Sequence, residues 1–155
     1  MGRSMRPGKA WTLLLLCGSA FLGGMAAADS TRHALAPGVF AEQLVLQRHG
    51  SRSVRLQFTV ANDSERPVSL RTLGILSAEL DMRDVSLIDF EAGVRYGVIA
   101  DGDGDYLGSH GPDEIAPGTR QSYWAQFAAP PQATRRLTIS FRNAMPIDGV
   151  LLQPE

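Results

Sequence analysis

The run Ser53-Val-Arg-Leu-Gln-Phe-Thr-Val-Ala61 decides how this chain folds. Apolar and polar side chains alternate along it, and an extended chain sends successive side chains to opposite faces. The polar members, Arg55, Gln57 and Thr59, therefore share one face, and the apolar members share the other. A period of two predicts a strand that is buried on one side and solvated on the other.

Turn chemistry and further short segments of strand-like composition lie on both sides of this run. The segment Asn62-Asp-Ser-Glu-Arg-Pro67 is typical of a turn, because its short polar side chains bond to nearby backbone and proline fixes its own φ. Other strands are predicted at residues 39–47, 68–70, 85–88, 94–99, 122–127 and 137–141. About seven to nine short strands separated by turns predict an all-β fold, an immunoglobulin-like antiparallel β-sandwich. A closed barrel is the alternative.

The first 28 residues have the pattern of a secretory signal peptide. Arg3, Arg6 and Lys9 precede an apolar run that ends in small residues, and Ala28 followed by Asp29 is the expected cleavage point. A retained membrane anchor is the alternative, but the apolar run is shorter than the ~20 residues a bilayer span needs. We therefore expect a signal peptide at 1–28, a flexible tail at 29–38 and one sandwich domain at 39–155.

Charge and cysteine usage narrow the class of protein further. The leader holds three of the 15 cationic side chains and none of the 16 acidic ones, so its removal leaves a net charge of −4. A nucleic-acid binder would show a basic excess, so no nucleic-acid partner is expected. The only cysteine, Cys17, lies in the leader, and the mature chain therefore has no disulfide. We expect a periplasmic or secreted protein with no transmembrane segment after cleavage.

Three stretches of the predicted domain carry a resemblance to a known group. They are Leu56-Gln-Phe-Thr-Val-Ala-Asn62, Ile115-Ala-Pro-Gly-Thr119 and Phe127-Ala-Ala-Pro-Pro131. They are similar to small bacterial secreted or periplasmic immunoglobulin-like modules, in which a strand ending in a Thr-Val-x-Asn turn is followed by an x-Pro-Gly turn and a late strand. The resemblance implies a sandwich fold, a location in the cell envelope and a role in adhesion, assembly or display. It implies no catalytic residues.

The segment Ala100-Asp-Gly-Asp-Gly-Asp-Tyr106 is the most conspicuous local motif. Asp101, Asp103 and Asp105 alternate with other residues, as carboxylates do in a Ca²⁺-binding loop. Tyr106 stands where such a loop needs glycine, and Asp-Gly pairs are ordinary hairpin chemistry. We predict a plain hairpin and no cofactor, with a calcium-stabilised module as the alternative.

The sequence lacks the motifs of the common classes of hydrolytic enzyme. Neither a Gly-x-Ser-x-Gly elbow, a Ser-x-x-Lys pair nor a His-Glu-x-x-His segment occurs. His33, His49 and His110 lack metal-ligand spacing. We therefore expect no catalytic residues and no enzyme activity; an unrecognised periplasmic enzyme is the alternative.

Aromatic residues and the loop Asp101 to Asp105 are the candidate contacts for a protein partner. Trp124, Tyr106 and Tyr123 are the predicted binding residues. If Tyr123 points inward, Trp124 points outward, and an exposed tryptophan suits a partner surface. The opposite register buries Trp124, and the sequence leaves both open. We predict a non-catalytic exported protein that acts as a binding or accessory and assembly subunit in the bacterial cell envelope, with another envelope protein or complex as its partner.

Overall fold

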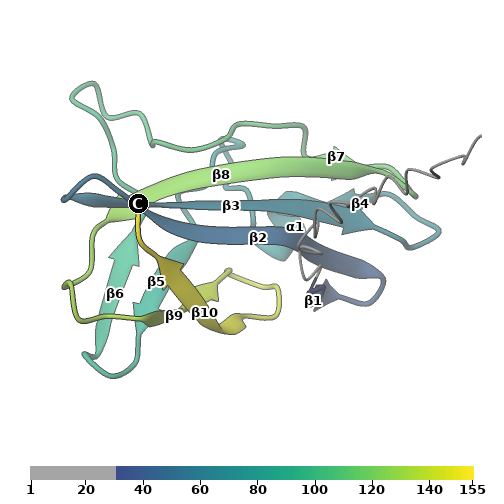
Figure 1. The fold of residues 1–155 in the computed structure, drawn as a ribbon. Helices are drawn as coiled ribbons and strands as arrows, with labels where there is room; N and C mark the ends of the chain where they lie inside the picture. The colour runs from purple at the N-terminus through teal and green to yellow at the C-terminus, as the bar shows by residue number, and fades with distance from the viewer. Residues whose placement is uncertain (1–30) are drawn as a thin grey trace, which may run out of the picture.

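The computed structural model describes residues 31–155, which are almost entirely β-structure (Figure 1). One single-turn helix, α1 (Leu70–Leu73), follows the fourth strand. The strands are β1 (His33–Ala36), β2 (Val39–His49), β3 (Ser53–Asn62), β4 (Val68–Ser69), β5 (Ser86–Asp89), β6 (Val94–Gly97), β7 (Glu114–Ile115), β8 (Arg120–Ala128), β9 (Arg136–Ser140) and β10 (Ile147–Gln153).

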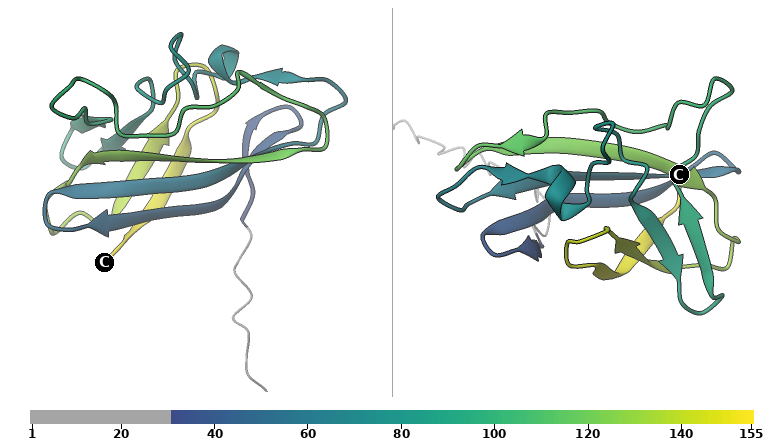
Figure 2. Two further views of the ribbon diagram at one scale, coloured as in Figure 1. Left: turned by 90° about the horizontal axis from the view of Figure 1, so that it is seen from above. Right: turned by 180° about the vertical axis from the view of Figure 1, so that it is seen from behind.

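The main sheet curls into two layers. Its order is β6-β5-β9-β10-β2-β3-β8, with β1 added to β2, and β4 and β7 form a separate pair. The long strands β2, β3 and β8 form one layer, and β5, β6, β9 and β10 cross behind it (Figure 2). The layers join where β10 runs parallel to β2 through Leu152 and Leu46; the other pairs of described strands are antiparallel. This arrangement confirms the predicted all-β sandwich.

The core fills the space between these layers. On β3, the alternate residues Val54, Leu56 and Val60 are fully buried, and Phe58 is 2% exposed, as the sequence pattern predicts. Tyr123, Ala125 and Phe127 of β8 lie on the same inner side. The second layer contributes six further apolar residues to this core: Leu87, Leu137, Ile139, Ile147, Val150 and Leu152.

Asn62 joins the two turns on which the family resemblance was based. Its fully buried amide donates to the carbonyl oxygens of Arg66 and Ile115, and its side-chain oxygen accepts from the backbone N–H and the hydroxyl of Ser64. The backbone N–H of Gly118 also donates to the Asn62 carbonyl. A buried amide with all these partners fixes the end of β3 against the Pro117-Gly118 turn.

Two expectations about the chain differ from the structure. The predicted flexible tail at 29–38 is wrong for residues 33–36, because β1 pairs with β2 and buries Leu35 to 1% exposure. The described strands number ten rather than seven to nine; β7, for example, has only two residues, which are too few to show a periodic pattern. The predicted signal peptide, with its cleavage point at Ala28 and Asp29, lies outside the described residues. Between residues 31 and 155, none of the helical structure is long and apolar enough to span a membrane.

Candidate functional site

The strand register places Trp124 on the outer face of the first layer. Its neighbours Tyr123 and Ala125 are buried, whereas Trp124 itself is partly exposed. Directly opposite on β3 stands Gln57, an outward-facing residue. The structure thus decides between the two registers that the sequence left open, and it leaves Trp124 available at the surface.

Tyr106 and Trp124 lie on opposite faces, so they do not form one site. Gly108 pairs with the buried Ala125, and residues that pair across strands share a face. Tyr106 is two positions before Gly108 and therefore lies on the inner side, where it packs against the core and the Arg83 guanidinium lies 4.7 Å from its ring centroid. The two aromatic residues remain separate candidates for partner contact.

Tyr123 lies in the core and offers no surface to a partner. It is 2% exposed and its ring lies 6.1 Å from that of Phe58. Its buried hydroxyl has no hydrogen-bond partner among the described residues. Burial raises the pKa of Tyr123 to about 12, because an ionised phenol would lose its hydration there. Its assignment as a contact residue is wrong because its position on β8 alternates with that of Trp124.

The acidic loop is a hairpin turn, as the Asp-Gly pairs predict. Ala100 pairs with Tyr106, and the backbone N–H of Asp101 donates to the carbonyl of Asp105 at 2.9 Å. One carboxylate oxygen of Asp101 accepts from the backbone N–H groups of Asp103 and Asp105. This carboxylate therefore stabilises its own turn.

A shallow depression of about 320 Å³ lies beside Trp124. Thr59 forms its centre: the hydroxyl donates to the amide oxygen of Gln43 at 3.2 Å and lies 3.0 Å from the Ser122 hydroxyl. These neighbours cover Thr59 to 7% exposure, although its position on β3 faces outward. We call this surface the Trp124 face; its residues are Gln43, Arg55, Gln57, Thr59, Ser122 and Trp124.

A bulge in β2 directs Gln43 into this depression. The pairing of β2 with β3 shifts register between Glu42 and Val45, and Gln43 has a left-handed φ of 51°. Few residues other than glycine, asparagine and aspartate adopt this conformation, and such strain is concentrated at functional sites. Bulges commonly re-aim one side chain beside such a site.

Arg55 holds the indole of Trp124 in place. Its guanidinium carbon lies 4.5 Å from the centroid of the Trp124 ring, which is within the range of a cation–π interaction. The Nε atom of Arg55 is buried and has no hydrogen-bond partner within residues 31–155. The pair combines a flat apolar surface with a cation that still has N–H groups to donate.

A charged network borders the Trp124 face where β2 and β8 continue beyond it. Glu42 accepts from Arg32 at 2.7 Å and from Arg120 at 3.1 Å, and Arg32 also pairs with Asp63. The hydrogen bond from Arg32 lowers the pKa of Asp63. The uncharged depression is therefore flanked by fixed, opposite charges.

Sequence reasoning identified Trp124 but missed the residues that surround it. Arg55, Gln57 and Thr59 were recognisable as the polar face of their strand, although nothing indicated which β8 residues lie opposite them. Gln43 carried no local signal, because a bulge is a property of paired strands and not of one strand alone.

Comparisons with known proteins give a likeness of fold only. No protein-family model matches the chain, and no curated protein matches it significantly. Two solved structures are similar: a copper-bound PCuAC domain from PmoF2, with a TM-score of 0.40, and the apo form of that domain, with a TM-score of 0.39. Each is 18% identical to this chain; the matches cover 80% and 81% of this chain and 99% and 97% of the domains.

This comparison corrects the expected cofactor. We expected none, with calcium at Asp101, Asp103 and Asp105 as the alternative, but the metal bound by the similar domain is copper. The similar domain thus differs both from the expected absence of a cofactor and from the calcium alternative. Within residues 31–155, no three side chains of His, Cys, Asp or Glu come together as a potential metal site.

Proposed function

We propose that this chain is an exported, non-catalytic binding module of the bacterial cell envelope that recognises a protein partner through the Trp124 face. The observation that carries the proposal is the outward Trp124 with Arg55 stacked on its ring. Tryptophan and arginine are enriched among the residues that dominate protein–protein binding energy. Export is supported by the leader-like pattern of residues 1–28.

The surroundings of Trp124 favour a protein partner. Gln57, Ser122 and the amide of Gln43 are uncharged and both donate and accept hydrogen bonds. Arg55 is the charged residue of this surface, and the network of Glu42 and Arg120 stands at its edge. Aromatic residues and arginine are enriched at protein interfaces, which are surrounded by a polar rim.

Copper is not part of this proposal, because residues 31–155 do not gather a ligand set for it. Soft copper sites use methionine, cysteine and histidine. Met82 is fully buried in the core, whereas Met145 is exposed in the segment between β9 and β10. His33 lies in β1 and His49 ends β2, and they do not belong to any cluster of three candidate ligands among the described residues.

The test compares Trp124→Ala with the native chain. The full chain is expressed in a bacterial host with its leader, cell fractions are separated, and the mass of the purified protein shows whether it begins at Asp29. Partners are then captured from the envelope fraction of the source cells, and the recovered protein is purified for direct binding. Loss of a contact worth at least about 2 kcal/mol weakens binding about 30-fold.

The matched control is Gln121→Ala, on the same strand but out of phase with Trp124. It should bind like the native chain. Arg55→Ala should weaken binding as Trp124→Ala does, because it removes the other half of the stacked pair. Native-like binding by both face variants would refute the proposed surface.

A further inference from the structure

A hollow lies on the outer face of the second layer, away from the Trp124 face. Its floor is a row of small residues across three strands, because Ser86 of β5 pairs with Gly97 of β6 on one side and with Ser140 of β9 on the other. Three arginines form the walls, and the hollow has a volume of about 570 Å³. We call it the Arg95 hollow; its main residues are Arg83, Ser86, Arg95, Gly97, Ser140 and Arg142.

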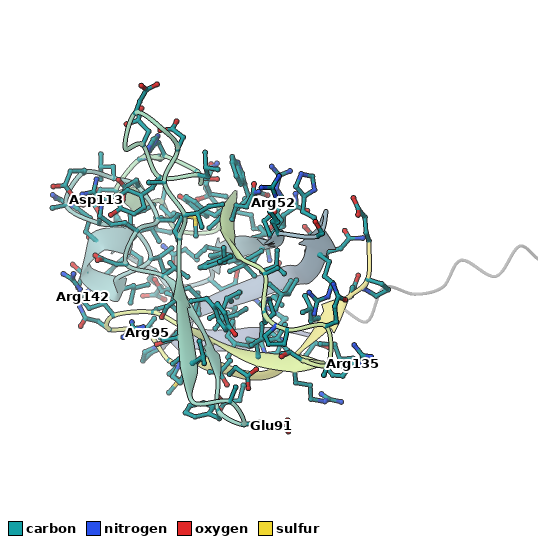
Figure 3. All side chains as sticks on the ribbon, turned by 90° about the vertical axis from the view of Figure 1, so that its left-hand side faces the viewer. Arg52, Glu91, Arg95, Asp113, Arg135 and Arg142 are labelled. Carbon is teal, nitrogen blue, oxygen red and sulfur yellow. The ribbon has the colours of Figure 1, made fainter. Side chains whose placement is uncertain are left out.

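Arginines from separate parts of the chain meet at this hollow. Arg95 lies on β6, whereas Arg142 follows β9 directly. Figure 3 shows both on the same side of the molecule, with Arg135 at the other end of the view. Arginine clusters are characteristic of sites that bind phosphate, sulfate or carboxylate groups, because the guanidinium fork matches two oxygens.

The three arginines differ in their partners. Arg83 pairs with Asp81 at 2.5 Å and with Glu79 at 3.5 Å, and Arg142 pairs with Asp84 at 2.8 Å. Arg95 makes no salt bridge with any described residue; its Nε donates to the Ser86 hydroxyl at 2.9 Å. Asp84, the acid that lines the hollow, is thus paired with Arg142, and the acids that pair with Arg83 are not part of the lining. The terminal nitrogens of Arg95 are left for a ligand.

Ser86 adds a buried donor to the floor. It is only 3% exposed, and its oxygen accepts the hydrogen bond from Arg95. A hydroxyl has one proton to donate in addition to the lone pairs that accept. Since the oxygen of Ser86 already accepts from Arg95, its proton can be donated to a ligand oxygen in the hollow.

We infer that the Arg95 hollow binds an oxyanion, a phosphate group in particular, through the terminal N–H groups of Arg95 and the Ser86 hydroxyl, with Arg142 at the rim. The volume exceeds that of a single phosphate, which suits a phosphate carried on a larger molecule. Three acids lie near three arginines, so the affinity for inorganic phosphate should be modest, with a Kd on the order of 1–10 mM. This site is independent of the Trp124 face and of the partner proposed there.

The test titrates inorganic phosphate into the isotope-labelled mature protein and follows the backbone amide resonances. We expect saturable shifts at Ser86, Gly97 and Ser140. Arg95→Gln should raise the Kd about tenfold or more, because a hydrogen bond to a charged group is lost. Arg142→Gln provides a second variant if Arg95→Gln does not fold, as judged by its circular dichroism.

Arg52→Gln is the matched control, since it removes the same charge from an exposed turn outside the hollow. It should leave the Kd unchanged. An equal loss in Arg52→Gln and Arg95→Gln would show nonspecific charge attraction and would overturn the inference. Shifts that do not saturate, or that map away from the hollow, would also overturn it.

A second arm distinguishes a free phosphate from a lipid headgroup. The protein is sedimented with vesicles of phosphatidylglycerol in phosphatidylcholine and with vesicles of phosphatidylcholine alone. Cosedimentation that requires phosphatidylglycerol and is lost in Arg95→Gln identifies the lipid as the source, whereas phosphate shifts without cosedimentation identify a soluble phosphate compound. The absence of both responses would refute the site.

Discussion

The buried hydroxyl of Tyr123 allows a sharp test of the core. Its ring is packed between the layers, but its oxygen has no hydrogen-bond partner among the described residues. Gly111 passes directly beside it: a methyl group placed on Gly111 would lie 3.3 Å from the Tyr123 oxygen. Tyr123→Phe removes the oxygen and keeps the ring, and we expect it to stabilise the protein.

The expected gain follows from the cost of burying an unpaired polar group. An unsatisfied buried donor or acceptor costs about 1–3 kcal/mol, and Tyr123→Phe removes that cost together with only a small volume. We therefore expect the free energy of unfolding to rise by about 1 kcal/mol at neutral pH. For a domain of this size that corresponds to an increase in Tm of about 4 °C.

Alkaline pH should enlarge the difference. The folded pKa of about 12 exceeds the ordinary value of 10, so the native state keeps its proton where the unfolded state loses it. As the pH rises from 10 toward 12, ionisation of Tyr123 in the unfolded state therefore lowers the free energy of unfolding of the native protein, by about 3 kcal/mol in total. Below pH 10 this loss is absent. The only lysine of the sequence is Lys9, so residues 31–155 have no lysine that titrates over this range.

The assay is urea denaturation of the native protein and of the Tyr123→Phe variant, followed by circular dichroism at pH 7 and at intervals above pH 10. The native chain should lose stability more steeply than the variant. Destabilisation of Tyr123→Phe by 1 kcal/mol or more at pH 7 would refute the reasoning. It would show that the hydroxyl is satisfied, as by a buried water molecule.

Two further predictions concern buried polar groups. Asn62→Ala should lower the free energy of unfolding, measured by urea denaturation, by about 3 kcal/mol or more, because the carbonyl of Ile115 and the turn at Ser64 lose their buried partner. The control Asn143→Ala removes one exposed hydrogen bond and should lower it by less than about 1 kcal/mol. Equal losses in the two variants would contradict this role for Asn62. The hydrogen bond from Arg83 lowers the pKa of Asp81 to about 2. The stabilisation of the folded state by ionised Asp81 is therefore complete above about pH 4 and is lost as the pH falls toward 2. Asp81→Asn should remove about 2 kcal/mol at pH 7 and flatten acid unfolding between pH 4 and 2; an unchanged acid profile would show that the ion pair contributes nothing.

The alternation of side chains made the strands predictable, but not the pairs between them. β3, β8 and β9 were recognisable because each has one buried face, which imposes a period of two on the sequence. β10 was missed: its bulge at Gly149 shifts the register between Ile147 and Val150 and interrupts the alternation. β1 was missed because its single buried residue, Leu35, has no local pattern around it.

The candidate sites depended on contacts between distant segments. Trp124 was identified from its residue type, but Gln43 and Arg55 reach it only through the pairing of three strands. Arg95 and Arg142 are far apart in the sequence and neither belongs to a motif. Their meeting at Ser86 follows from the order β6-β5-β9, which no local pattern specifies.

By itself, the sequence determined that the chain forms short strands, that β3 buries its alternate residues Val54, Leu56, Phe58 and Val60, and that the Asp-Gly repeat makes a turn. These features depend on residues close together along the chain. Only the tertiary structure decided that Trp124 faces outward and Tyr123 inward, because both registers of β8 satisfy the local alternation and only packing against the second layer distinguishes them.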